Sequence, residues 1–96
     1  MQRNTKLALE LLEILVVEDH TGVGLYREEI QAVFAEKYPD HEAGRREAVD
    51  YHLHLLETAG YIVLVPAEHD EPSFKPTWAG HDYLGKDEKT ASFFDF

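Results

Sequence analysis

The sequence contains no cysteine, which excludes disulfide bonds and thiolate metal sites and fits a reducing cytosol. It also contains no run of about 18 apolar residues, so no segment is long enough for a membrane span. Internal repeats, low-complexity tracts and long linkers are absent as well, and we expect residues 1–96 to form a single domain. The sequence therefore predicts a cytoplasmic protein with one hydrophobic core.

Positive charge is scarce. Nine Lys and Arg residues stand against nineteen Asp and Glu residues, which gives a formal net charge of −10. This charge disfavours nonspecific attraction to the phosphates of nucleic acids. It also has a simpler interpretation, because a high net charge by itself keeps a small protein soluble.

Hydrophobic periodicity predicts two helices in the first half of the chain. In residues 5–17 apolar side chains recur at helical spacing, and Asn4 or Thr5 offers a capping oxygen at the start. The second helix is expected over residues 27–38, and Pro39 stops it because proline lacks a backbone N–H group. A brief strand at residues 25–26 fits between the two helices.

Residues 48–62 carry the most specific pattern in the chain, an amphipathic helix that ends at a glycine and continues into a strand. One broad side of this helix is apolar and includes His52, which we expect to be buried with a hydrogen bond to the backbone. Gly60 provides the left-handed residue with which helices commonly end. The β-branched run at residues 61–65 then predicts a strand.

A hairpin is expected after this helix. The acidic, proline-flanked segment 66–73 reads as a solvent loop, and residues 74–76 read as a return strand. Pro76 cannot donate a ladder hydrogen bond, so this strand should lie at a sheet edge or end at Pro76.

A fourth helix is expected over residues 77–85, with Thr77 as its cap. Gly80 inside a helix costs about 1 kcal/mol relative to alanine, which predicts a close approach between the helix and another backbone segment. Trp78 and Leu84 are the expected core contacts, and Trp78 and Tyr83 are interpreted as packing residues rather than as a platform for nucleic-acid bases.

This order of elements resembles that of a winged helix. The resemblance is carried by YHLHLLETAGYI at residues 51–62, and by PTWAGHDYL at residues 76–84, which is similar to the segment that opens the last helix of such domains. Together they resemble a family of short phage- and prophage-associated proteins of unassigned function. The resemblance implies an α+β fold, a winged helix-turn-helix with a three-helix core, a β-hairpin wing and a C-terminal helix.

In winged-helix domains the third helix enters a DNA groove, and the loop at residues 66–73 would be the wing. Asp40 or Gly44 is expected to cap this helix, with residues 44–46 before its regular part. The residues that could contact DNA are Arg45, Arg46, Tyr51 and His54, with Arg27 and Arg3 added in a weakly binding dimer. The wing, however, carries Glu68, Asp70 and Glu71 and no Lys or Arg, which opposes binding to phosphates.

The preferred interpretation is therefore a protein–protein contact. The outward side of the third helix offers Glu47, Asp50 and Glu57, and the acidic-aromatic tail at residues 86–96 adds Phe93, Phe94 and Phe96. These aromatic side chains either pack against the first helix or a second copy, in a homodimer, or dock in a partner's basic groove. A transcription-regulator-type DNA-binding protein is the alternative, and an acidic DNA-mimic-like inhibitor of a nucleic-acid-binding protein is the second alternative.

No pattern for catalysis or for metal binding is found. Gly22-Val-Gly24 lacks the further glycine of a phosphate loop, and there is no serine in a nucleophile turn. His52 and His54 point in different directions on a helix, and the other four of the six histidines show no ligand spacing. We expect no enzyme activity, no metal site and no cofactor.

Overall fold

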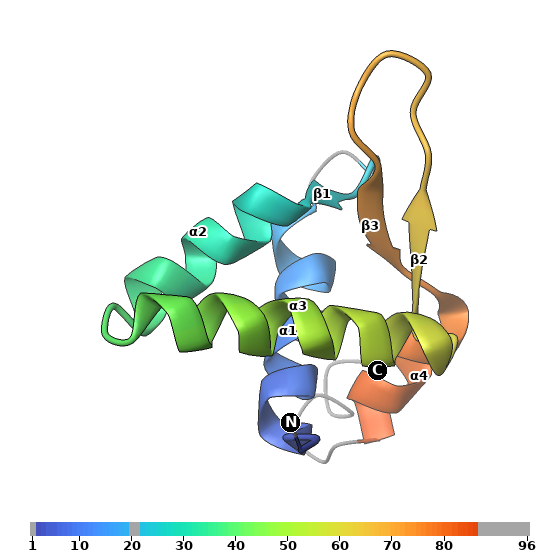
Figure 1. Cartoon of the computed structure of the whole chain (residues 1–96). Coiled ribbons are helices and arrows are strands. Elements are labelled where there is room, and N and C mark those ends of the chain that lie inside the picture. The colour runs from blue at the N-terminus through green and yellow to red at the C-terminus, as the bar shows by residue number, and fades with distance from the viewer. Residues whose placement is uncertain (1, 20–21, 87–96) are drawn as a thin grey trace.

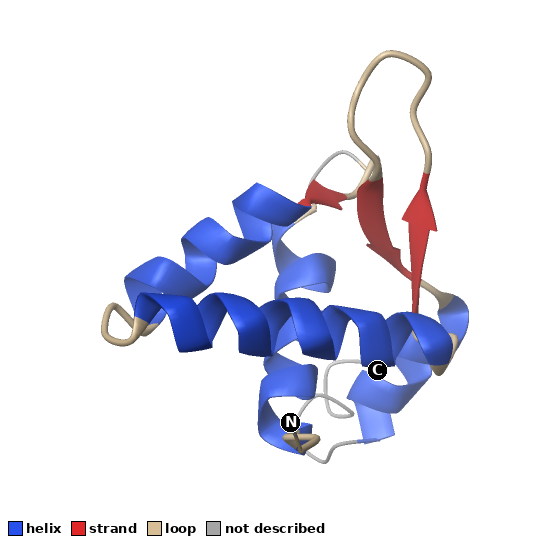
Figure 2. Cartoon of the chain, in the orientation of Figure 1, coloured by secondary structure: helices blue, strands red, loops and turns tan. Residues whose placement is uncertain are grey.

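A computed structural model of the chain describes residues 2–19 and 22–86 and has an α+β architecture (Figures 1 and 2). In this part of the chain there are four helices and a three-stranded antiparallel sheet. The elements are α1 (Thr5–Glu18), β1 (Leu25–Tyr26), α2 (Arg27–Lys37), α3 (Glu42–Thr58), β2 (Ile62–Val65), β3 (Ser73–Pro76) and α4 (Trp78–Lys86). This is the predicted order, and most bounds agree with the prediction within one or two residues.

The core surrounds α1, which packs against α3, α4 and β3. Figure 1 shows α3 crossing α1, with α2 on one side and the β2–β3 hairpin projecting beyond the helices. Burial of each aliphatic or aromatic side chain in this core stabilises the folded state by about 1.5–3 kcal/mol relative to its exposure to water. The buried hydrophobic residues are Ala8, Leu11, Leu12, Ile14, Leu15, Leu25, Ile30, Phe34, Val49, Leu53, Leu56, Ile62, Phe74 and Leu84.

The sheet has the strand order β1-β3-β2, so the strand that contains Pro76 is the central one. The alternative that this strand lies at a sheet edge is wrong, and the alternative that it ends at Pro76 is confirmed. The reason is the shortness of β1, which pairs only with Ser73 and Phe74. Pro76 pairs only with Ile62 of β2, so its missing N–H group interrupts no hydrogen bond with β1.

The turn that leads into β2 and the turn that follows β3 have the expected chemistry. Gly60 ends the α3 segment with a φ of 84°, which only glycine adopts without cost. The Thr77 hydroxyl accepts a hydrogen bond from the Gly80 N–H group at 3.0 Å, as a helix cap should, and donates to the Gly60 carbonyl at 2.6 Å. These two bonds join the end of α3 to the start of α4.

Gly80 makes the close approach that its position in a helix predicts. A Cβ atom placed there would collide with the carbonyl oxygen of Tyr61, and Leu84, one turn later, is buried. Trp78 lies two residues before Gly80, about 200° around the helix, and its side chain is 86% exposed. The prediction that Trp78 contacts the core is therefore wrong, because Gly80 and Leu84 define the inward side of α4. Tyr83 does pack, with its ring stacked on that of Tyr61 at 4.5 Å between centroids.

Candidate interaction surface

The start of α3 differs from the prediction. The helix begins at Glu42, so residues 44–46 lie inside its first turns, and neither Asp40 nor Gly44 is the cap. His41 occupies the capping position with a left-handed backbone, φ 59°, and makes no side-chain capping bond. The first helical hydrogen bond runs from the Arg45 N–H group to the His41 carbonyl at 2.9 Å. Glu42 in the first turn adds a negative charge where the helix dipole favours one.

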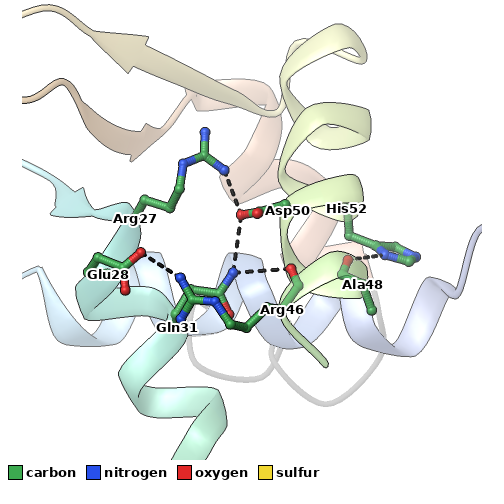
Figure 3. Close-up of polar contacts among 7 residues, drawn as sticks. All are labelled: Arg27, Glu28, Gln31, Arg46, Ala48, Asp50 and His52. Carbon is green, nitrogen blue, oxygen red and sulfur yellow. Dashed lines mark hydrogen bonds and ion pairs between the residues drawn. The ribbon is translucent and has the colours of Figure 1, made fainter. Parts of the chain in front are cut away.

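Both arginines at the start of α3 are engaged within the molecule. The Arg45 guanidinium donates through Nη1 to the Tyr38 carbonyl, at the end of α2, over 2.8 Å. The Arg46 guanidinium forms an ion pair with Glu28 of α2 at 2.8 Å, and this hydrogen bond raises the pKa of Arg46. The two cations closest to the expected DNA face thus hold α2 and α3 together. Figure 3 shows the pair formed by Arg46 and Glu28.

Asp50 is also engaged within the molecule, at the centre of a polar network between α2 and α3. Its Oδ1 atom accepts hydrogen bonds from Arg27 Nη1 at 2.7 Å and from Gln31 Nε2 at 3.1 Å. Gln31 is 2% exposed, and its Nε2 atom also donates to the Arg46 carbonyl at 3.2 Å. Figure 3 shows these side chains converging from the two helices. The assignment of Asp50 to a partner surface is weakened, because its carboxylate already has two donors.

Beyond the first turn of α3, the exposed side chains that have no described polar partner form the remaining surface. Glu47, His54 and Glu57 are exposed, and Tyr51 is half-buried with its ring edge-on to His52 at 5.3 Å. We call Glu47, His54 and Glu57 the outer α3 face. It carries two carboxylates and no Lys or Arg, so its chemistry suits a partner with positive charge.

His52 lies on the opposite side of α3 and is 1% exposed. Its Nε2 atom accepts a hydrogen bond from the Asn4 N–H group at 2.7 Å, and Nδ1 lies 2.7 Å from the Ala48 carbonyl. This geometry requires the neutral tautomer with the proton on Nδ1. The prediction of a buried histidine bonded to the backbone is confirmed, and its imidazole links α3 to the start of α1.

The loop between β2 and β3 is also acidic. Glu68, Asp70 and Glu71 are all exposed. The Tyr26 hydroxyl donates to Asp70 Oδ2 at 2.8 Å, which lowers the pKa of Asp70 and raises that of Tyr26. This bond attaches the β2–β3 loop to the start of α2.

Other predicted candidates are not brought together. Phe93, Phe94 and Phe96 lie outside the described residues. His81, one of the four histidines without ligand spacing, is exposed on α4. Over residues 2–19 and 22–86, no group of three or more His, Asp or Glu side chains has the geometry to hold a metal ion.

Sequence reasoning missed the role of Gln31 and the engagement of Arg27 with Asp50. A signal for Gln31 was present, since it lies three residues before the buried Phe34 on the inward side of α2. The pairing of Arg27 with Asp50, 23 residues apart, depends on how α2 crosses α3 and has no local signal.

Within the described part of the chain, none of the helices has the length and apolar character needed to cross a membrane. Comparison of the sequence and the structure with protein-family models, with curated proteins and with solved structures finds no match in any of the three.

Proposed function

We propose that this chain is a winged-helix domain that acts through protein–protein contacts rather than by catalysis. The order helix, strand, helix, helix and hairpin supports the winged-helix assignment, as does the central position of β3 between β1 and β2. The resemblance of residues 51–62 and 76–84 to short phage- and prophage-associated proteins supports a regulatory or host-interaction role in a phage or prophage.

The engagement of the cations beside α3 is the observation that carries this proposal. Arg27, Arg45 and Arg46 each bind an acceptor within the molecule, at 2.7–2.8 Å. A protein that binds duplex DNA needs such cations free to neutralise phosphates. Here they neutralise Asp50 and Glu28 or bind a carbonyl, and the outer α3 face keeps its carboxylates. A partner with a cationic surface therefore suits this face.

Capture of partners from a host lysate with two charge-reversed variants tests this proposal. Glu47→Lys with Glu57→Lys reverses the outer α3 face, and Glu13→Lys with Glu36→Lys makes the same charge change at exposed positions of α1 and α2. We expect the first variant to lose a partner that the second keeps. Equal capture by both would show that the outer α3 face is not the contact.

An electrophoretic shift assay on nonspecific duplex DNA tests the alternative. We expect no shift at micromolar protein and 150 mM salt, because the acidic face and wing repel phosphates. Micromolar binding that falls steeply with salt and disappears in the Arg45→Glu, Arg46→Glu variant would instead establish a DNA-binding protein.

The acidic surface also supports a second candidate, an inhibitor that occupies the nucleic-acid groove of its partner as a DNA mimic. The carboxylates of the outer α3 face and of the wing would then take the place of phosphates. Duplex DNA should compete with the captured partner if this candidate is correct, and should leave the complex intact if the contact lies elsewhere on the partner.

A further inference from the structure

Two adjoining pockets lie between the start of α1, the end of α3 and α4. They share Thr5 and Tyr83 and have volumes of about 260 and 130 Å³. We call them together the tyrosine groove, because the stacked rings of Tyr61 and Tyr83 line it. Covering this groove would remove apolar surface from water. The aliphatic side chains that line it in the described part of the chain are Ala8, Leu9, Leu55, Leu56 and Ala59.

The charge of the tyrosine groove is opposite in sign to that of the whole chain, which is −10. Among the described residues, the charged groups that line it are the cations Arg3 and Lys86. Asp82 lies one turn before Lys86 on α4 but forms no described ion pair with it, and Glu10 is paired with Lys37 of α2. The described carboxylates that adjoin the groove in the sequence line neither of its pockets: Glu10, Glu57 and Asp82. The groove therefore suits aromatic rings accompanied by negative charge.

Residues 87–96, which lie outside the described residues, have this composition. Their sequence, Asp-Glu-Lys-Thr-Ala-Ser-Phe-Phe-Asp-Phe, contains three carboxylates, one lysine and three phenylalanines. They follow Lys86, which itself lines the tyrosine groove. Phe93 is seven residues beyond Lys86, and an extended chain of that length spans about 23 Å. This span is close to the shortest extent of the molecule, 24 Å, so Phe93 can reach every part of the groove.

Two other arrangements are less favourable. The pocket between α1, the end of α2 and the start of α3 mixes the carboxylates Glu10 and Asp40 with the cations Lys6 and Arg45, so its charge does not select an acidic segment. A segment from another chain would have to compete with residues 87–96. Their covalent attachment at the groove gives them an effective concentration on the order of millimolar.

We infer that the tyrosine groove is the docking site of the chain's own residues 87–96, with Phe93 and Phe94 against the tyrosine pair. Arg3 and Lys86 then lie beside the carboxylates of the segment. Of the roles open to the three phenylalanines, this selects packing against the domain over docking in a partner. The groove shares no residue with the outer α3 face, so the inference does not depend on the proposed function.

Fluorine NMR of the full chain, labelled with 3-fluorotyrosine, tests this inference. The chain has five tyrosines, and single substitutions by phenylalanine assign their resonances. We expect Phe93→Ser with Phe94→Ser to shift the resonances of Tyr61 and Tyr83, because these rings lose aromatic neighbours. The other tyrosines line no part of the groove, and we expect no shift for Tyr26, Tyr38 and Tyr51.

A synthetic peptide with the sequence of residues 90–96, Thr-Ala-Ser-Phe-Phe-Asp-Phe, provides the second measurement. At millimolar concentration it should return both resonances of the Phe93→Ser, Phe94→Ser chain to their original positions. In that chain, Ala59→Glu adds a carboxylate to the groove and should weaken peptide binding about tenfold by repulsion. Ala43→Glu, at the other end of α3, is the matched control, since both alanines are exposed and Ala43 lines neither pocket. It should leave binding unchanged.

The inference is overturned if the resonances of Tyr61 and Tyr83 do not respond to the loss of Phe93 and Phe94, or if both glutamate variants bind the peptide equally. A peptide that fails to restore the two resonances also overturns it, since the first shift would then have another cause. A shift at Tyr38 instead would assign the segment to the pocket between α1, α2 and α3. Resonances that move on dilution from millimolar to micromolar protein would show docking in a second copy, and would overturn docking within one chain.

Discussion

His52 shows how one side chain joins two distant parts of the chain. Its imidazole is enclosed in the core and accepts the Asn4 N–H group, 48 residues away, while Asn4 itself caps α1 through Oδ1. The bond therefore fixes the start of α1 against the middle of α3. The side chain of His52 therefore contributes to the fold, as its position on the apolar side of the helix predicts.

Substituting His52 by leucine isolates this bond. Leucine retains apolar bulk but offers no acceptor to the Asn4 N–H group, so we expect a loss of about 1–2 kcal/mol in the free energy of unfolding. Chemical denaturation at constant m-value measures it. The control is His54→Leu, at an exposed position of the same helix, for which we expect a change within about 0.5 kcal/mol. Equal effects would mean that the bond contributes nothing to stability.

Gly80 gives a second prediction at the residue scale. In an open helix, Gly→Ala stabilises by up to about 1 kcal/mol. At Gly80 the added methyl group meets the Tyr61 carbonyl, a backbone atom that cannot swing aside, so we expect a destabilisation of about 2–3 kcal/mol. Gly85→Ala, in the same helix with open space around it, should be neutral or stabilising. Thermal or chemical unfolding of the two variants gives the comparison, and the same sign of change in both would contradict the role assigned to Gly80.

At the scale of elements, α1 and α2 are joined by a carboxylate that has two donors. Glu10 on α1 forms an ion pair with Lys37 at 2.8 Å and accepts hydrogen bonds from the Tyr38 hydroxyl at 2.9 and 3.0 Å. Burial acts to raise the pKa of Glu10, but the bonds from Lys37 and Tyr38 together outweigh it and leave this pKa below its ordinary value. The charged form of Glu10 therefore stabilises the folded state.

The pH dependence follows from the direction of this shift. Because the pKa of Glu10 is lower in the folded state, its contribution is complete above the ordinary value of 4.5 and is lost as the pH falls through the lowered value. We expect Glu10→Gln to cost about 0.5–1 kcal/mol at pH 7, with the deficit shrinking towards pH 3. Denaturation of both proteins across this range measures the deficit.

Glu13→Gln, at an exposed position of the same helix, is the control for this comparison. Its effect at pH 7 should be smaller than that of Glu10→Gln. A deficit for Glu10→Gln that stays constant down to pH 3 would contradict the assigned cause.

The sequence predicted elements better than it predicted the contacts between them. Helical periodicity, Gly60 and Thr77 depend on local chemistry, and the structure agrees with each. Trp78 was misassigned because periodicity groups residues by side without saying which side faces the core. The contact between Gly80 and the Tyr61 carbonyl sets which side of α4 faces the core, and no local pattern in the sequence shows which residue Gly80 contacts.

The candidate surface was predictable to a similar degree. The exposure of Glu47, His54 and Glu57 follows from the amphipathic pattern of α3 and agrees with the structure. The engagement of Arg46 and Asp50 does not follow from it, because both pairings cross to α2, and α3 was expected to start later than Glu42. Tertiary geometry thus decided which charges remain available to a partner.

At the scale of the whole molecule, the excess of negative charge has to be accommodated in a small volume. A formal charge of −10 belongs to a chain whose Cα radius of gyration is 13.3 Å. This net charge already counts every Lys and Arg, three of which form ion pairs with carboxylates at 2.7–2.8 Å in the described residues. Repulsion among the other carboxylates opposes the compact state, whereas these pairs favour it.

Added salt should therefore raise the stability, because it weakens the repulsion more than the ion pairs. The Debye length falls from about 30 Å at 0.01 M to about 8 Å at 0.15 M. The first value is comparable with the extents of 40 × 33 × 24 Å, and the second is much shorter than them but still longer than a 2.8 Å contact. We expect the free energy of unfolding to rise by about 1 kcal/mol over this range, measured with urea, which is uncharged.

Glu47→Gln with Glu57→Gln removes two carboxylates of the outer α3 face that have no described ion pair, so the free energy of unfolding of this variant should rise less with salt. A stability that falls with salt would show that the ion pairs outweigh the repulsion.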